Sequence, residues 1–587
     1  MLLDVKAFFA TLICICAAKE NGPIAKGYRQ EYGRQLDSTI KLNGIRQVDQ
    51  AHNQVPLLQY NISYSGIMFS SPNDYVAIYP CRDEDCGVLD VAPLRFKQVN
   101  SSASEPVLLY LWVMPGVKAV RIAYVAPLQN QYPEVLCMTE VLTIDKRIQT
   151  MPMGVRTSLV ADEPNAVRII WSQSRFSVKS LRQIKKRFRV HVGTESGNYS
   201  HGVHGVKAVY SYNSGDFCDK QMQFAATTGY VDPGYQVEVI IRGLKHDTEY
   251  YYKITDTHGK FPERELEFVT PPTLHQRTRM SIFGDQGQSL HHLDNSSQHS
   301  WDFHGQGELP AENTTKLMKH LADNVGIRLF AHIGDLSYAT GSLGLWDAWL
   351  RQNEVISSKY PYMTAIGNHE MVHAHSFVKG ADSQGECGRP YAAFFPFASQ
   401  DYHKKSVNHI ITSRGYENPW YSYDYGLVHV TVMSTEHDYT PGSRQYKWIK
   451  RDLESVNRGN TPWLVFQTHR PLYISGQDTL QPRVLETLLL QNKVDIVVSG
   501  HHHTYQRSCR HLANSKCQES NGIQYFVAGT AGYASAQLPS DRDSRFEFAT
   551  DKAWGIPTFD FVNATAANVQ FFDNSEFSVL DQTWVYR

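Results

Sequence analysis

Five uninterrupted apolar runs in the second half of this 587-residue chain each end in a short polar string. The strings are, in chain order, GDQG at 284–287, GDLSY at 334–338, GNHE at 367–370, QTH at 467–469 and GHHH at 500–503. Apolar runs without alternation are typical of strands that are buried on both faces of a sheet. Since ligands gather at the carboxyl ends of such strands, we expect the five strings to meet in one site.

Helical patterns lie between these strands and indicate the fold class. They cover 311–324, 442–456 and 482–491. Strands that alternate with helices predict an α/β domain. The tail at 555–587 is again strand-like, and we expect it to complete the second sheet of this domain.

The N-terminal half has the pattern of β-sandwiches. Short alternating runs separated by Pro, Gly, Asn and Ser cover about 40–148 and predict an antiparallel β domain. A second set follows at the spacing of a small sandwich, and its segment 243–255 resembles the late strands of a fibronectin type III domain. We therefore expect a leader, two all-β domains and the α/β domain at 1–18, 19–150, 151–271 and 272–587.

Residues 1–18 are typical of a secretory signal peptide, with an apolar stretch after a basic residue and the small residues Cys16 and Ala18 placed for cleavage. A buried N-terminal helix is the alternative. Beyond the leader, Cys509 and Cys517 form the best local disulfide pair among an odd number of cysteines. Several Asn-X-Ser/Thr sequons are compatible with a glycoprotein. We expect a secreted, extracellular protein or one delivered to a vacuolar or lysosomal lumen.

The charge balance restricts the class of partner. The chain has 57 basic and 58 acidic residues, so it lacks the basic footprint of a nucleic-acid-binding protein. No segment beyond the leader approaches the length of a membrane span. A phosphate-binding site must then be local, and the oligomeric state, monomer or homodimer, stays open.

The five polar strings supply side chains for two metal ions. The candidate ligands are Asp285, Asp335, Tyr338, Asn368, His469, His501 and His503. Carboxylate, amide, phenolate and imidazole form a mixed hard and borderline set, which argues against a structural zinc site built on thiolates. Asp335 and Tyr338 lie three residues apart on one loop, so both can approach one ion. A phenol with a pKa of about 10 becomes a ligand only if a highly charged ion removes its proton, so Tyr338 indicates Fe(III).

The three consecutive histidines of the fifth string are expected to point in different directions. His501 and His503 are separated by one residue, and in an extended stretch their side chains point the same way. We expect His502 to point oppositely, either supporting the site from outside or facing solvent. Burying three consecutive histidines costs free energy unless metal ions or hydrogen bonds satisfy their ring nitrogens.

With these motifs the chain resembles the large plant-type purple acid phosphatases of the metallophosphoesterase superfamily. The resemblance runs from about residue 155 to the end and, more loosely, through the N-terminal β domain. It includes YVDPGY at 230–235, DSQGECGRPY at 382–391, WYSYDYG at 420–426 and STEHD at 434–438. Generic two-metal phosphoesterases begin with an Asp-x-His motif. Here Gly287 replaces that histidine and Tyr338 is present, which is the pattern of the purple subgroup.

The resemblance implies a two-sheet βαβ sandwich and a dinuclear Fe(III)–M(II) centre, in which Asp335 bridges the ions. Fe(III) would be bound by Asp285, Tyr338 and His503, and a divalent ion, Zn, Mn or Fe, by Asn368, His469 and His501. The two metals would clamp a phosphate and lower the pKa of a bound water, giving a hydroxide for in-line attack on phosphorus. The implied activity is that of an acid phosphatase on small phosphate monoesters, highest at acidic pH.

The string GNHE also carries a candidate catalytic residue. His369 matches the family position that donates a proton to the leaving alcohol or orients the phosphate. Glu370 is either the partner that orients His369 or a solvated acid of the loop.

One departure from the family pattern concerns substrate contacts. Many members place substrate-facing histidines between the QTH-like and GHHH-like strings, but 470–500 contains none. Arg470, Tyr473 and Gln477 are the candidates to replace them. The sequence offers no physical basis to choose among the three.

Two other functions are consistent with the same motifs. The metal core constrains the attacking water and not the leaving group, so a phosphodiesterase, nucleotide pyrophosphatase or phytase is an alternative. A weakly active binding protein, using its roughly 270 N-terminal residues as a docking surface, is another. Because a degenerating enzyme tends to lose metal ligands and none is missing here, the sequence favours activity.

Overall fold

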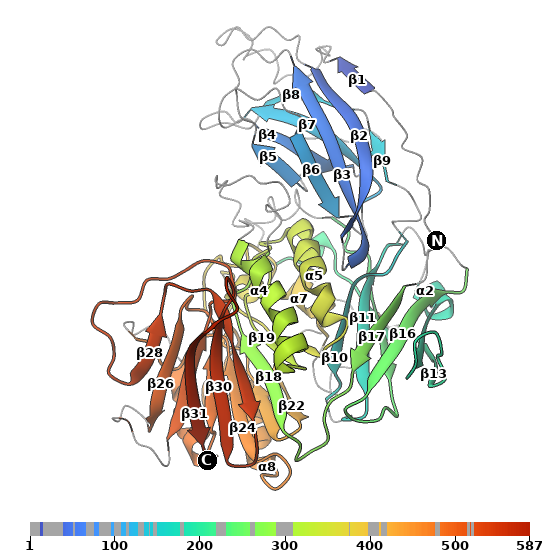
Figure 1. The fold of residues 1–587 in the computed structure, drawn as a ribbon. Coiled ribbons are helices and arrows are strands. Elements are labelled where there is room, and N and C mark those ends of the chain that lie inside the picture. The colour runs from blue at the N-terminus through green and yellow to red at the C-terminus, as the bar shows by residue number, and fades with distance from the viewer. Residues whose placement is uncertain are drawn as a thin grey trace.

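The computed structural model describes most of the chain. The described ranges are 12–15, 39–50, 53–65, 75–81, 95–98, 107–112, 117–126, 134–139, 141–144, 150–161, 163–175, 181–218, 231–258, 264–288, 309–374, 376–396, 410–411, 419–475, 482–512, 517 and 522–587. Their strands and helices fall into an N-terminal, a middle and a C-terminal part (Figure 1).

Two antiparallel sheets form the N-terminal part, drawn in blue in Figure 1. One sheet has the order β1 (Leu12–Ile15), β2 (Thr39–Gln50), β3 (Asn53–Ser65) and β6 (Val107–Trp112). The other has the order β5 (Arg95–Gln98), β4 (Tyr75–Pro80), β7 (Ala119–Ala126) and β8 (Glu134–Met138), with β9 (Leu142–Thr143) paired to β7. In β7, Val120, Ile122 and Tyr124 point to one face and are fully buried, and Ala123 on the other face is buried as well, so this strand lies in the core. Strand β1 lies inside the predicted leader, which stays a prediction.

The middle part is a second β-sandwich. Its first sheet contains β10 (Met153–Leu159), β11 (Val167–Gln173), β15 (Tyr235–Ile241), β14 (Ala208–Tyr210) and β21 (Ile410–Ile411). Its second sheet contains β13 (Gly202–Gly205), β12 (Phe188–Gly193), β16 (Glu249–Asp256) and β17 (Glu265–Val269). Short helices α2 (Leu181–Arg187) and η2 (Ser214–Asp216) connect strands. Trp171, Val239 and Tyr252 belong to one buried cluster between the sheets, which confirms the predicted all-β fold of this part.

The C-terminal part contains two mixed sheets. In the first, β20 (Tyr362–Ala365), β19 (Phe330–Ile333) and β18 (Thr278–Phe283) are parallel and continue into antiparallel β29 (Gly555–Phe561), β30 (Ala566–Asp573) and β31 (Val579–Tyr586). The second has the order β22 (Tyr421–Tyr425), β23 (Val428–Val432), β24 (Trp463–Thr468), β25 (Ile496–Ser499), β27 (Ile523–Ala528), β26 (Tyr505–His511) and β28 (Phe546–Thr550). The C-terminal tail thus completes the sheet that carries the first three motif strands.

Helices accompany these sheets, and the three predicted at 311–324, 442–456 and 482–491 are present, whereas those at 343–357, 368–371 and 389–394 were not predicted. They are α4 (Leu309–His320) with η4 (Leu321–Val325), α5 (Leu343–Ser357), α6 (Asn368–Met371), α7 (Arg389–Phe394), α8 (Arg444–Ser455), η7 (Pro482–Leu485) and α9 (Glu486–Gln491). Helix α8 begins after Ser443, whose side chain accepts a hydrogen bond from the backbone N–H of Tyr446. The alternation of strands and helices confirms the α/β class of this part.

The middle and C-terminal parts are joined by buried contacts. Arg156 on β10 donates from Nε and Nη2 to the carbonyl of Phe394 at the end of α7, over 2.9 and 2.7 Å. Glu354 on α5 accepts from the backbone N–H of Gly154 at 3.0 Å. A buried arginine stabilises such an interface only when its N–H groups all find acceptors, so these bonds fix β10 against the helices.

Two disulfides have both partners among the described residues. Cys509 pairs with Cys517, which confirms the predicted local bridge. Cys218 pairs with Cys387 across 169 residues and so ties the middle part to the loop before α7. Within the ranges given above, no helix is both long enough and apolar enough to cross a membrane.

Candidate metal centre

The five polar strings lie at the carboxyl ends of five strands, as the sequence predicts. Asp285 follows β18, Asp335 and Tyr338 follow β19, and Asn368 follows β20 in the first sheet. His469 follows β24, and His501 and His503 follow β25, in the second sheet. Because these strands are parallel within each sheet, their carboxyl ends meet along one edge of the sandwich.

Three candidate ligands form the first half of the cluster. The hydroxyl oxygen of Tyr338 lies 3.0 Å from Asp285 Oδ1 and 3.0 Å from His503 Nε2. His503 Nε2 lies 3.3 Å from the same Asp285 oxygen. Asp285 is fully buried, and its other oxygen accepts the backbone N–H of His501 at 2.8 Å. Phenol, carboxylate and imidazole therefore converge on one small volume.

Four further side chains form the second half. Asn368 Oδ1 lies 2.8 Å from His469 Nε2 and 2.8 Å from His501 Nδ1. The second oxygen of Asp335 lies 3.3 Å from His469 Nε2. Ligand atoms of Asp335, His469 and His501 all lie within 4.8 Å of one another, a spacing that one ion can span. The structure thus brings all seven predicted ligands together.

The backbone carrying these side chains is strained. Asp285, Asp335, Tyr338 and His501 have positive φ angles of 65°, 51°, 51° and 67°. A residue with a Cβ in this region costs about 1–3 kcal/mol, and such strain clusters at functional sites where the surroundings enforce it. Four strained positions among seven candidate ligands indicate that the loops are shaped to aim these side chains.

Close packing explains one of the motif glycines. A Cβ on Gly367 would lie 2.2 Å from Asp335 Oδ1 and 2.5 Å from the backbone nitrogen of Asp335. Only glycine lets the loop after β20 pass this close to the carboxylate. The glycine of GNHE is therefore required by the position of Asp335.

Two acidic side chains, Glu370 and Asp382, position the loops and the ligands through hydrogen bonds. Glu370 is buried and accepts three backbone N–H groups, from Asp335, Leu336 and Gly367, at 2.8–2.9 Å. Burial and the nearby Asp335 raise the pKa of Glu370 to about 8. Asp382 accepts from the amide nitrogen of Asn368 at 3.0 Å, which turns the amide oxygen toward the histidines.

Comparison with known proteins gives the family. Residues 152–270 match the purple acid phosphatase N-terminal domain, 254–505 match calcineurin-like phosphoesterases, and 522–582 match the iron/zinc purple acid phosphatase-like protein C family. Purple acid phosphatase 23 of Arabidopsis thaliana is 30% identical over 367 residues, which cover 57% of this chain and 69% of the relative. The chain belongs to the purple acid phosphatase family.

Other purple acid phosphatases extend the comparison. Probable inactive purple acid phosphatase 9 of A. thaliana is 33% identical over 334 residues, which are 53% of this chain and 49% of the relative. The chain spans about half the length of the relatives of this kind that it matches. The purple acid phosphatase PPD1 from yellow lupin (Lupinus luteus) seeds has the same fold, with a TM-score of 0.75, 23% identity, and coverage of 90% of this chain and 93% of that one. The predicted fold class is thereby confirmed.

The purple acid phosphatase family implies a dinuclear metal centre, and the donor atoms fit one. His469 Nδ1 lies 3.0 Å from the carbonyl of Ile333, which can only accept, so the lone pair of the neutral ring is on Nε2. Nε2 faces two oxygens, of Asn368 and Asp335, and lone pairs that face one another need a proton or a metal cation between them. Burial lowers the pKa of His469, but the Asp335 carboxylate outweighs this effect and raises the pKa to about 10. The site therefore attracts positive charge.

Tyr338 fits a highly charged ion. Burial, together with the carboxylates of Asp285 and Asp335, raises the pKa of Tyr338 well above its usual value. The phenol stays protonated in the absence of a strong cation. Fe(III), which the sequence analysis expects, would be such a cation.

A tyrosine that the sequence did not reveal covers this half of the purple acid phosphatase site. Tyr533 follows β27, and its ring stacks on Tyr338 with a centroid distance of 3.4 Å and an interplanar angle of 5°. A Cβ on Gly287 would lie 3.2 Å from the Tyr533 ring. The volume beside Gly287 is thus filled by an aromatic ring. The sequence feature that could have revealed Tyr533 is a sixth apolar run, IQYFVA at 523–528, which is followed by GTAGY.

His369 lies at the edge of the cluster. Its ring centroid is 4.4 Å from that of Tyr338, and its backbone N–H donates to Asp335 Oδ1 at 2.9 Å. Its Nδ1 is buried without a hydrogen-bond partner among the described residues. Glu370 is buried and its hydrogen bonds reach backbone amides, so it is neither the partner that orients the His369 ring nor a solvated acid; it supports the two loops instead.

The remaining candidates occupy different places. Arg470 Nη1 lies 2.9 Å from His501 Nε2, so it belongs to the site. His502 turns away, and its Nδ1 lies 2.8 Å from Thr504 Oγ1. Tyr473 is fully buried in a separate core cluster, and its hydroxyl donates to Glu486 at 2.7 Å, so the structure does not bring it to the site. Gln477 lies outside the described residues.

Proposed function

We propose that the protein is an acid phosphatase that hydrolyses small phosphate monoesters at a dinuclear Fe(III)–M(II) centre. The observation that carries this proposal is the convergence of all seven donor side chains, from five separate loops, on one buried volume. When bound, two such ions supply the Lewis acidity that holds phosphoryl oxygens and acidifies a water molecule. Because a trivalent ion acidifies water more strongly than a divalent one, we expect the highest activity at acidic pH.

The chain's own residues have distinct tasks in this proposal. Asp285, Tyr338 and His503 would hold Fe(III), and Asp335 would face both ions. The divalent ion, Zn, Mn or Fe, would be held by Asn368, His469 and His501. His369 lies beside the cluster, its Nδ1 has no hydrogen-bond partner among the residues that the structure describes, and it would hold the proton that the leaving alcohol takes up.

The arrangement of the whole chain supports the same proposal. We infer three units after the leader, at 19–150, 151–271 and 272–587, of which the last carries the chemistry. The Cys509–Cys517 and Cys218–Cys387 disulfides support export to an oxidising compartment. The words "probable inactive" in the names of several relatives concern those proteins, and the complete donor set supports activity for this one.

The test is hydrolysis of p-nitrophenyl phosphate by the purified, iron-containing protein, with ATP, a phosphate diester and phytate compared under the same conditions. We expect turnover of the monoester, fastest at about pH 5, since the acidified water stays deprotonated there. Faster turnover of the diester, ATP or phytate would select the corresponding alternative. No turnover of any of the four by protein that holds two metal ions would overturn the proposal and favour a binding protein.

A further inference from the structure

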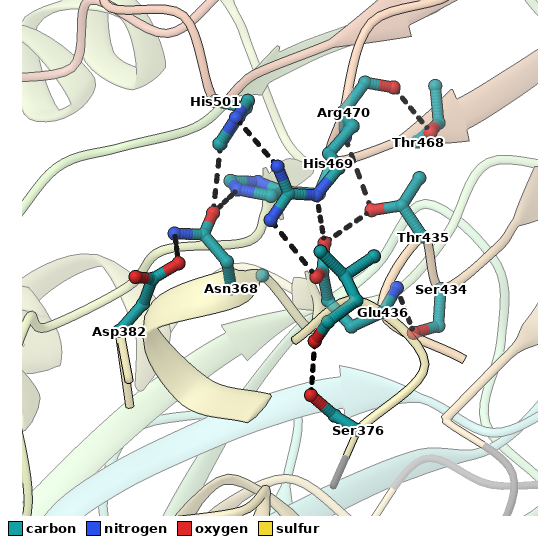
Figure 2. Close-up of polar contacts among 12 residues, drawn as sticks. Asn368, Ser376, Asp382, Ser434, Thr435, Glu436, Thr468, His469, Arg470 and His501 are labelled. Atoms are coloured by element: carbon teal, nitrogen blue, oxygen red, sulfur yellow. Dashed lines mark hydrogen bonds and ion pairs between the residues drawn. The ribbon is translucent and has the colours of Figure 1, made fainter. Parts of the chain in front are cut away.

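Arg470 is held rigidly at the rim of the metal cluster. Its Nε and Nη2 lie 2.9 and 3.2 Å from the two carboxylate oxygens of Glu436, a two-point ion pair (Figure 2). Its backbone N–H donates to Thr435 Oγ1, and its carbonyl accepts from Thr468 Oγ1. The Arg470 side chain is 14% exposed, whereas Glu436 is fully buried. The guanidinium therefore points one edge into the protein and leaves the other edge toward the site.

The contact between Arg470 and His501 conflicts with metal binding by His501. Nη1 of Arg470 lies 2.9 Å from Nε2 of His501, while Nδ1 of the same ring faces Asn368 Oδ1 (Figure 2). A guanidinium N–H can only donate, so Nε2 must carry a lone pair and Nδ1 must carry the ring's hydrogen. If Nδ1 instead binds a metal ion, the hydrogen of the neutral ring moves to Nε2. Two donors then face each other, and Arg470 loses its acceptor.

The released N–H groups of Arg470 need a new acceptor in the same place. A guanidinium has five N–H bonds, and Glu436 accepts two of them, from Nε and Nη2. The outer edge therefore keeps three N–H bonds free to donate, one on Nη2 and two on Nη1. Two parallel N–H groups on one edge match two oxygens of a tetrahedral oxyanion. The His501 ring, with which Nη1 is in contact, is itself one of the candidate metal ligands. An oxyanion held by the metal ions would lie beside it.

We propose that Arg470, positioned by the buried carboxylate of Glu436, is a phosphate-binding residue of this site and takes over the role for which 470–500 supplies no histidine. The inference rests on the proposed function and extends it to substrate recognition. In the metal-loaded protein, the Arg470 guanidinium leaves His501 Nε2 and donates two hydrogen bonds to phosphoryl oxygens. The two-point ion pair with Glu436 fixes the orientation of the guanidinium and keeps it at the site when the substrate leaves.

The test compares binding of inorganic phosphate to the metal-loaded wild type and to Arg470→Gln by titration calorimetry. Metal content and the KM for p-nitrophenyl phosphate are measured on the same samples. We expect the dissociation constant of phosphate and KM to rise by a factor on the order of 10 to 100, as for loss of a charged hydrogen-bond donor, with both metal ions retained. An unchanged phosphate dissociation constant, or loss of metal from Arg470→Gln, would overturn the proposal.

Two further variants separate binding from folding. Because Arg470→Gln leaves Glu436 buried and unpaired, we also replace the pair together, Arg470→Gln with Glu436→Gln. The double variant should recover thermal stability and still bind phosphate weakly; recovery of both would make Arg470 a structural partner only. The matched control is Arg187→Gln, which breaks a buried pair with Asp256 in the middle part and should lower stability while leaving the phosphate affinity of the folded protein unchanged.

The outcome for Arg470 does not depend on turnover. If the wild type hydrolyses no ester, the proposed function fails, but calorimetry with inorganic phosphate still measures what Arg470 contributes. If the wild type is active and the phosphate affinity of Arg470→Gln is unchanged, the phosphatase proposal survives and the assignment of Arg470 fails.

Discussion

Replacing Asp335 by asparagine is expected to empty both metal positions. One oxygen of Asp335 lies 3.3 Å from His469 Nε2, and the other accepts the backbone N–H of His369. An asparagine keeps the shape but replaces one oxygen by an NH₂ group, which cannot bind a cation and loses the negative charge. Replacing partners outside the ligand shell already costs about 10–100-fold in metal affinity, so we expect a larger loss here. Metal content per chain and kcat/KM for p-nitrophenyl phosphate measure the effect.

The control for this prediction is a second aspartate on the same sheet. Asp560 on β29 pairs with Arg277 and Arg279 away from the cluster, and Asp560→Asn should leave metal content and turnover unchanged. If Asp335→Asn retained both ions and near-normal turnover, Asp335 would not lie between the two metals.

His369→Ala is expected to slow turnover while leaving the metal ions in place. The substitution removes an imidazole whose Nδ1 has no hydrogen-bond partner in the part of the chain that the structure describes, but it keeps the backbone N–H that donates to Asp335. Loss of a positioned proton donor lowers kcat by about 10²–10⁴-fold. The loss should be largest for an alkyl phosphate, whose alcohol needs a proton to leave, and smaller for p-nitrophenyl phosphate. Comparison of kcat for the two esters measures the difference.

His502→Ala provides the matched control, since this neighbouring histidine turns away toward Thr504. We expect its turnover to stay close to that of the wild type. Should His369→Ala lose metal ions, or slow both esters equally, the role of His369 as a proton donor would be contradicted.

The clustering of the candidate ligands could be predicted from the sequence because each of them is tied to a local pattern. Asp285, Asp335 and His501 all follow a glycine at the end of an apolar run, so a reading of single strings finds them. Parallel pairing then brings the strand ends together without further information. The Cys509–Cys517 pair was also local, whereas Cys218–Cys387 spans 169 residues and depends on the tertiary fold.

Other parts of the fold left no such pattern. Helix α5, LGLWDAWLRQNEVIS, is buried around most of its surface, and even Asp347 and Arg351 are buried, so it has no polar stripe to mark it as a helix. The positions of the Tyr533 and Tyr473 side chains likewise could not be predicted from the local sequence. One is 195 residues away from Tyr338 in sequence yet stacks on it, and the other lies four residues from His469 yet packs into a different core.

Metal analysis together with the visible spectrum of the purified protein shows directly whether the site is a mixed dinuclear centre with Tyr338 bound to Fe(III). We expect two metal ions per chain, at least one of them iron, and a purple phenolate-to-iron absorption band. Tyr338→Phe should lose this band. A protein that binds one ion or no iron, or a visible band that persists in Tyr338→Phe, would contradict this assignment of the site.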